Sequence, residues 1–194
     1  MKFTSSYIAE SKEILNKIDL NKIEGIISEI SKLKERKGRI FFLGLGGSAA
    51  NCSHAVNDFR KLCDIECYTP MDNIAEFSAR VNDDGINSSF SNWLKTSKLN
   101  KKDLIFIFSV GGGDKKRNVS TNLIMAVDYA LKIKCKIISI VGKKDGYANI
   151  KAFKSLVIPI INKKNITPHS EGMQAVIWHL IISHPLLKKN KTKW

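Results

Sequence analysis

Two patterns of apolar residues alternate along this chain. Between residues 5 and 36, apolar side chains recur at helical spacing, which predicts one long helix or two consecutive ones. These side chains are Ile8, Ile14, Ile18, Ile23, Ile26, Ile27, Ile30 and Leu33. The other pattern is a short continuous apolar run, which is typical of a strand buried on both faces. RIFFLG at residues 39–44 predicts the first such strand, and DLIFIFSV at residues 103–110 predicts the clearest one.

The rest of the chain continues this alternation. Further strands are predicted near residues 67–68, 136–142 and 156–160. Helices are predicted at about residues 48–62, 73–80, 86–98 and 118–133, and from after Thr167-Pro168 to about His184. NDDG between the second and third of these helices is predicted to be a turn. Short, doubly buried strands alternating with helices predict an α/β fold, with a parallel sheet covered on both faces.

Length and composition are those of one globular domain. The chain has 194 residues, of which 43% are apolar, and we expect a single domain over 1–194 with a helical segment at 1–36 and a basic, mobile tail at 186–194. No run of about 18 apolar residues is present, so a membrane span is not expected. The first residues lack the apolar stretch of a signal peptide, which predicts a cytoplasmic protein. The four cysteines contain no Cys-x-x-Cys pair, and we expect free thiols.

The charge balance is strongly basic, with a formal net charge of +14. Much of this charge lies in lysine-rich connections between the predicted elements, and no basic stripe is interleaved with aromatic residues. Specific binding of nucleic acid is therefore not expected. Attraction of anionic metabolites, such as sugar phosphates, accounts for the same charge.

Two glycine-rich turns follow predicted strands and lead into predicted helices. The first comprises Gly44, Leu45, Gly46, Gly47 and Ser48, and the second comprises Ser109, Val110, Gly111, Gly112 and Gly113. Turns of this kind bring backbone N–H groups and the positive end of a helix dipole close to an anion. Neither turn has the spacing of a dinucleotide-binding or Walker motif, and glycine also ends strands for steric reasons. Two such turns in one sheet favour a ligand that contains phosphate.

Residues suited to acid–base or metal chemistry follow the first turn and recur near the end of the chain. His54 and Asp58 are four residues apart and share one helix face. They can bind one metal ion, they can be a histidine that tunes a carboxylate, or they can be a solvated surface pair. Glu171 and His179 are eight residues apart, which is about 12 Å of rise and about 80° of rotation in a helix. Both can reach one metal only if Glu171 lies in the first helical turn, and a metal-free acid–base site is the alternative.

Four segments resemble the phosphoheptose isomerases, which belong to the sugar isomerase (SIS) domain group. They are GLGGSAANCSHAVND at 44–58, RVNDDGINSSFS at 80–91, DLIFIFSVGGG at 103–113 and EGMQAVIWHLII at 171–182. The resemblance implies a three-layer sandwich around a five-stranded parallel sheet, and a homotetramer. It also implies an activity, the interconversion of sedoheptulose 7-phosphate and a glycero-manno-heptose 7-phosphate, which supplies heptose for bacterial surface polysaccharide.

The same resemblance implies roles for individual residues. A zinc ion is expected on His54, Asp58, Glu171 and His179, with Asp58 as base and His179 as ligand or acid. The expected catalytic residues are Asp58, His179 and Glu171. The residues expected to bind the substrate or its phosphate are Gly46, Gly47, Ser48, Asn82, Asp83, Ser109, Gly111, Gly112, Gly113 and Gln174.

The chain also departs from the family pattern. Leu45 replaces an asparagine of the first turn, and Asp58 is one methylene shorter than the family's glutamate. The second turn is glycine-rich where the family has serine and threonine, and Asp114 adds negative charge there unless Lys115, Lys116 or Arg117 offsets it. An isomerase of another sugar phosphate and a non-catalytic sugar-phosphate-binding module are the alternative functions.

Overall fold

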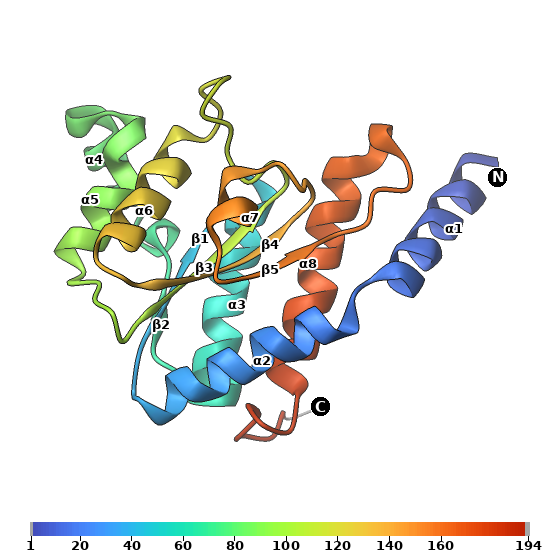
Figure 1. Ribbon diagram of the computed structural model, residues 1–194, viewed down its shortest axis with the longest axis horizontal. Coiled ribbons are helices and arrows are strands. Elements are labelled where there is room, and N and C mark those ends of the chain that lie inside the picture. Colours follow the sequence, from blue (N-terminus) through green and yellow to red (C-terminus); the bar gives the residue numbers. More distant parts are fainter. Residues whose placement is uncertain (1, 193–194) are drawn as a thin grey trace.

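The computed structural model describes residues 2–192 and consists of helices on both sides of one sheet (Figure 1). The strands are β1 (Ile40–Leu43), β2 (Cys67–Tyr68), β3 (Leu104–Ser109), β4 (Lys136–Val141) and β5 (Lys154–Val157). The α-helices are α1 (Lys2–Lys17), α2 (Leu20–Glu35), α3 (Gly47–Cys63), α4 (Ile74–Asp84), α5 (Ser89–Thr96), α6 (Thr121–Lys132), α7 (Tyr147–Lys151) and α8 (Ile166–Ser183).

The sheet is parallel throughout and its strand order is β2-β1-β3-β4-β5. Successive residues of a strand point to opposite faces, so the continuous apolar runs supply two cores. Phe42 and Phe106 contribute to the core on the side of α2, α3 and α8. Phe41 and Ile105 contribute to the core on the side of α5, α6 and α7. The predicted three-layer α/β/α sandwich with five parallel strands is confirmed.

Several predicted boundaries need correction. The first helical segment is two helices, which is one of the two predicted arrangements, and Asp19 caps the second by accepting a hydrogen bond from the Lys22 N–H. The predicted strand at 156–160 begins and ends earlier, at Lys154–Val157, and α6 begins at Thr121 instead of 118. α8 begins at Ile166, and Pro168 fits in its first turn because no intrahelical hydrogen bond needs its missing N–H there. The helix α7 was not predicted.

The basic segment after α8 makes contacts over most of its described length. The side chain of Leu187 is fully buried, and the Lys189 and Asn190 N–H groups both donate to the Leu62 carbonyl oxygen at the end of α3. Lys189 Nζ also lies 2.8 Å from an Asp64 carboxylate oxygen. The last two residues of the predicted tail lie outside the described part of the chain.

α1 projects beyond the sheet and is fastened to the start of α8 by one polar clamp (Figure 1). Glu10 accepts hydrogen bonds from the side-chain amides of Asn165 and Asn162, each at 2.8 Å, and its carboxylate lies 2.8 Å from His169 Nε2. The Tyr7 ring stacks on the His169 ring. These hydrogen bonds, the one from Asn165 first, lower the pKa of Glu10 to about 2. The only buried residue of α1 is Ile14, so this clamp is a large share of what holds the helix in place.

Candidate functional site

The first glycine turn brings the end of β1 into close contact with the start of α3. A Cβ atom at Gly44 would lie 2.6 Å from the Ser48 carbonyl oxygen, which excludes any other residue there without a backbone shift. Gly46 precedes the helix with φ 60°, a conformation that favours glycine. The turn therefore fixes where α3 begins, and with it the direction in which the side chains of α3 point.

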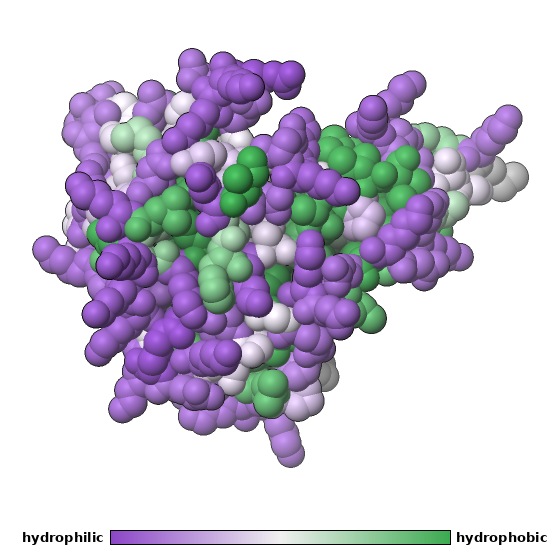
Figure 2. Space-filling view, in the orientation of Figure 1, coloured by the Kyte–Doolittle hydropathy of each residue, from purple (hydrophilic) through white to green (hydrophobic). Residues whose placement is uncertain are grey.

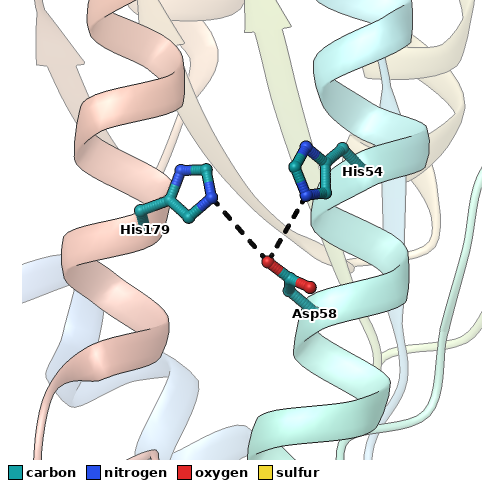
Figure 3. A group of neighbouring side chains, drawn as sticks. All are labelled: His54, Asp58 and His179. Atoms are coloured by element: carbon teal, nitrogen blue, oxygen red, sulfur yellow. Dashed lines mark ion pairs between the residues drawn. The ribbon is translucent and has the colours of Figure 1, made fainter. Parts of the chain in front are cut away.

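Three of the predicted site residues lie together between α3 and α8 (Figure 3). His54 and Asp58 come from α3, and His179 comes from α8. The Asp58 carboxylate is 3.6 Å from His54 Nε2 and 3.8 Å from His179 Nε2. Asp58 is 15% exposed, whereas the two histidine side chains are 58% and 48% exposed. We call these three residues the His–Asp–His cluster.

The distances in this cluster are longer than those of direct hydrogen bonds between the side chains. A hydrogen bond between a ring nitrogen and a carboxylate oxygen is about 2.7–3.2 Å long, shorter than either distance observed. His179 Nδ1 lies 2.7 Å from the Ala175 carbonyl oxygen, which only accepts, so Nδ1 carries the proton. In the neutral ring, His179 Nε2 is then an acceptor facing a carboxylate, and a cation or proton between them removes the repulsion.

The donor atoms of the cluster also suit a metal ion. One ligand atom from each residue lies within 4.8 Å of the others. Two imidazoles and one carboxylate are a ligand set that catalytic zinc uses, with a fourth position left open. The hydrogen bond from His179 Nδ1 to Ala175 is the kind of support that orients a metal-binding histidine. The three residues therefore fit a zinc ion.

Trp178 supports both histidines, a role that the sequence did not suggest. Its side chain is fully buried, as expected for a core residue. The indole stacks on the His179 ring, with centroids 3.5 Å apart, and meets the His54 ring edge-on at 4.7 Å. Only the position of Trp178 next to His179 could have suggested this contact from the sequence.

Glu171 is not part of the cluster, which corrects the expected set of four ligands. Its carboxylate accepts a hydrogen bond from the Ser48 N–H at 3.1 Å, at the start of α3. One helical turn further along, Asn51 donates to the Gln174 side-chain oxygen at 3.2 Å. Both pairs are 123 residues apart, so α3 and α8 run side by side in the same direction. The rise of about 12 Å between Glu171 and His179 thus keeps them at different levels along α8.

Gln174, predicted to bind the substrate, lies between α3 and α8 and is fully buried. Its side-chain oxygen is paired with Asn51, and its Nε2 donor is buried with no hydrogen-bond partner among the described residues. Asn51 also donates to the Glu171 carbonyl oxygen at 2.9 Å, so it fastens the backbone of α8 to α3. This bridging role of Asn51 was not predicted.

The second glycine turn is stabilised by hydrogen bonds within the turn and to α7. The Ser109 hydroxyl oxygen accepts from the Gly112 N–H at 2.9 Å, and Gly112 and Gly113 both have positive φ. Their carbonyl oxygens accept from the first N–H groups of the short helix α7. The carbonyl groups of Gly112 and Gly113 are thus occupied by α7, and the conformation of the turn does not depend on a ligand.

Asp114 does not place its charge on the second glycine turn. Its carboxylate accepts from the backbone N–H groups of Lys116 and Arg117, at 2.9 and 3.1 Å, within a hairpin closed by Asp114 and Val119. At the start of α6, the Asn122 side chain is 2% exposed and its Nδ2 donor has no partner among the described residues. Asn122 was not predicted as a site residue, because a helix start at 118 places it inside the helix instead of at its beginning.

Asn82 and Asp83 lie in the last turn of α4 instead of in a loop, and both are exposed. The Asn82 amide donates to the Asp83 carboxylate at 2.8 Å. Asn87, shortly after them, is hydrogen-bonded to Thr121 at the start of α6. The segment that contains Asn82 and Asp83 is therefore connected to the start of α6, which lies next to Gly113 of the second glycine turn.

Comparison with solved structures places this architecture. A phosphoheptose isomerase from Francisella tularensis superposes with a TM-score of 0.77, covering 93% of this chain and 92% of that one at 19% identity. The phosphoheptose isomerase from Neisseria gonorrhoeae gives a TM-score of 0.78, covering 93% and 95% at 19% identity. The chain has the phosphoheptose isomerase fold. No protein-family model and no curated protein sequence matches it.

The same fold also occurs in a protein that is not described as an isomerase. The Vibrio vulnificus NanR protein complexed with ManNAc-6P has a TM-score of 0.62 and 13% identity, over 92% of this chain and 58% of NanR. The fold alone therefore does not distinguish catalysis from binding, and this distinction depends on the side chains of the site.

Among residues 2–192, no helix combines the length and the apolar character that crossing a membrane requires.

Proposed function

We propose that this chain is a phosphosugar isomerase that interconverts an aldose phosphate and a ketose phosphate. The observation that supports it most is the convergence of His54, Asp58 and His179, from two helices, in a phosphoheptose isomerase fold. The expected substrate is sedoheptulose 7-phosphate, and the expected product is D-glycero-D-manno-heptose 7-phosphate. Such a step supplies heptose for surface polysaccharide.

In the proposed mechanism the cluster moves one proton between adjacent carbons. The Asp58 carboxylate removes a proton from the carbon next to the carbonyl group. His179, starting as the imidazolium with protons on both nitrogens, gives its Nε2 proton to the carbonyl oxygen, which yields an enediol. The proton on Asp58 then returns to the other carbon, while His179 takes the proton from the other hydroxyl oxygen. Each group ends in its starting state, so the cycle needs no further reactant.

Zinc is the metal expected at the cluster, on His54, Asp58 and His179. Bound there, it would supply positive charge for the oxygen atoms of the enediol intermediate. With zinc on its Nε2, His179 would act as a ligand and not as the acid, so these two roles of His179 are alternatives. Ala175 fixes the proton on His179 Nδ1 and leaves Nε2 available, and Trp178 holds both imidazole rings in place.

The substrate's phosphate is proposed to bind at the second glycine turn. The N–H groups of Gly111 and Gly113 and the hydroxyl proton of Ser109 are the available donors, and the start of α6 adds its dipole. The buried Asn122 amide, which has an unused donor, lies at the same helix start. Asn82 and Asp83 are proposed to contact the sugar from the adjacent segment.

A homotetramer is proposed as the functional assembly, with a dimer as the simpler form. His179 is half exposed, and its neighbours Val176 and Leu180 are 46% and 42% exposed. An enediol site profits from the exclusion of water, which a second copy over this face would provide. Figure 2 shows further hydrophobic surface around α1 and the start of α8. Light scattering at micromolar concentration tests the assembly, and a monomer would contradict it.

Exchange with heavy water tests the reaction itself. With sedoheptulose 7-phosphate in D₂O, the protein should introduce deuterium at C1 or C2. NMR spectra of the sugar measure this incorporation. We expect Asp58→Asn and His179→Ala each to lower kcat by about 100-fold or more, the scale of a lost acid or base. KM should change less, because the phosphate contacts are intact. His184→Ala is the matched control, since His184 lies at the end of α8 and faces Glu24.

Wild-type turnover in both cluster variants would contradict this mechanism.

The second candidate is a non-catalytic module that binds a sugar phosphate, favoured by the shared fold with the ManNAc-6P complex of NanR. It predicts saturable binding of the sugar phosphate with no deuterium exchange in the wild type. The two candidates are therefore separated by the wild-type measurement alone.

A further inference from the structure

The start of α3 lacks a cap of its own. Its N-cap residue is Gly46, which has no side chain to accept a hydrogen bond from the first turn. The Gly46 carbonyl oxygen accepts from Ala49 and Ala50, which leaves the N–H groups of Gly47 and Ser48 directed out of the helix end. Free N–H groups at the positive end of a 17-residue helix are a place where an anion is stabilised.

That place is already occupied by a carboxylate of the chain itself. Glu171 Oε1 accepts from the Ser48 N–H at 3.1 Å and lies 3.5 Å from the Ser48 hydroxyl. The other oxygen, Oε2, is so close to Gly47 that a Cβ atom there would be 2.4 Å from it. Ser48 is 1% exposed, and Asn51 holds the Glu171 backbone, so the carboxylate is positioned from both helices.

The two glycine turns are therefore electrostatically different. The first turn presents its N–H groups to Glu171, whereas Asp114, which directly follows the second turn, directs its carboxylate into its own hairpin. Two anions cannot share one small site without strong repulsion. A phosphate entering the first turn would have to displace Glu171 or acquire a proton.

We propose that Glu171 is a specificity-determining residue, an internal anion that closes the first glycine turn to phosphate. The substrate end that meets this turn is then uncharged, such as a hydroxyl-bearing carbon, and sugars with a phosphate at both ends are rejected. This inference rests on the proposed function, because it takes the substrate to be a sugar monophosphate with its phosphate at the second turn. It replaces the expected role of Glu171 as a metal ligand.

Binding of inorganic phosphate tests the proposal without any measurement of activity. Calorimetric titration at low salt should give one phosphate per chain for the wild type and two for Glu171→Gln, which keeps the shape but removes the charge. Glu35→Gln is the matched control, since Glu35 is exposed at the end of α2 and its change alters the net charge equally. The control should behave as the wild type does.

The outcomes separate this inference from the proposed function. If Glu171→Gln binds as many phosphates as the wild type, with affinity within twofold, the role of Glu171 is wrong. If the wild type binds none and Glu171→Gln binds one, Glu171 acts as proposed and the phosphate site at the second turn is wrong. If no variant binds phosphate, both are wrong.

Two further measurements guard against a variant that is merely damaged. In Glu171→Ala the first turn is left open, so sodium formate should raise its thermal midpoint relative to sodium chloride of equal ionic strength, with no such gain in the wild type. Equal effects of formate on both proteins would overturn the proposal. As inhibitors, fructose 6-phosphate should outcompete fructose 1,6-bisphosphate in the wild type, and Glu171→Gln should reduce this preference by about tenfold or more. An unchanged preference would also overturn it.

Discussion

Substitution of Gly47 by alanine offers a direct test of where the Glu171 carboxylate lies. Alanine is normally the better residue in a helix, by about 0.5–1 kcal/mol relative to glycine. Here the added methyl group would lie 2.4 Å from Glu171 Oε2 and 2.7 Å from Glu171 Cδ, closer than real contacts allow. The carboxylate is the end of a flexible side chain, whereas Gly47 is backbone, so the carboxylate moves.

The expected size of the effect follows from the hydrogen bond that is lost. A cap at a helix start contributes about 1 kcal/mol, and the interaction of its charge with the helix dipole adds about 0.5 kcal/mol. Gly47→Ala should therefore destabilise the wild type by about 0.5–1 kcal/mol, despite the better helix propensity. In a Glu171→Ala background no carboxylate remains to be displaced, so the same substitution should stabilise by about 0.5–1 kcal/mol.

The assay is urea unfolding at neutral pH and one fixed protein concentration, for the four proteins of this double-mutant cycle. The expected coupling between positions 47 and 171 is about 1.5 kcal/mol, or about 3–6 °C in thermal midpoint for a chain of this size. Gly172→Ala is the control, because a Cβ atom at Gly172 meets nothing within 4 Å. It should stabilise both backgrounds equally. If Gly47→Ala also stabilises both backgrounds by the same amount, Glu171 does not occupy the first turn.

Three further predictions concern the clamp on α1, the metal and the thiols. The folded-state pKa of Glu10 is about 2 and its ordinary value is 4.5, so the wild type should lose stability as pH falls from about 4.5 to about 2, and Glu10→Gln should lose less over that window. Elemental analysis after dialysis against zinc should find one zinc per chain, and His54→Ala should lower zinc affinity by tenfold or more, with His184→Ala unchanged. Burial raises the pKa of Cys63 to about 11 and that of Cys67 to about 12, so a thiol reagent at pH 8 should label them only after unfolding; prompt labelling would contradict their burial.

The strands were predictable because their physical signal is local. The first five residues of β3 are all apolar and all buried, which is typical of a strand whose sheet is covered on both faces. β5 was displaced in the prediction because Lys154 and Ser155 begin this edge strand, and the apolar residues that suggested it continue past its end. α7 has five residues and no amphipathic repeat, so no periodic pattern could have indicated it.

The site was predictable only where its residues lie on one helix. His54 and Asp58 were identified as a pair by their spacing, and His179 joined them through the resemblance to phosphoheptose isomerases. Glu171 was placed wrongly because its partner, Ser48, is 123 residues away and no local pattern connects them. Contacts between separate helices depend on their register, which the sequence of neither helix specifies alone.

The attachment of α1 has the features of a helix that two copies of a chain can exchange. It has 16 residues, a single buried side chain, and a linker of only residues 18–19 before α2. Its chief anchor is the hydrogen-bonded contact of Glu10 with the start of α8. A second copy of the chain has the same residues at the start of its own α8. A hinge and a self-complementary clasp are the two parts from which swapped dimers are built. In this fold, assembly can thus reuse an intramolecular contact without the evolution of a new interface.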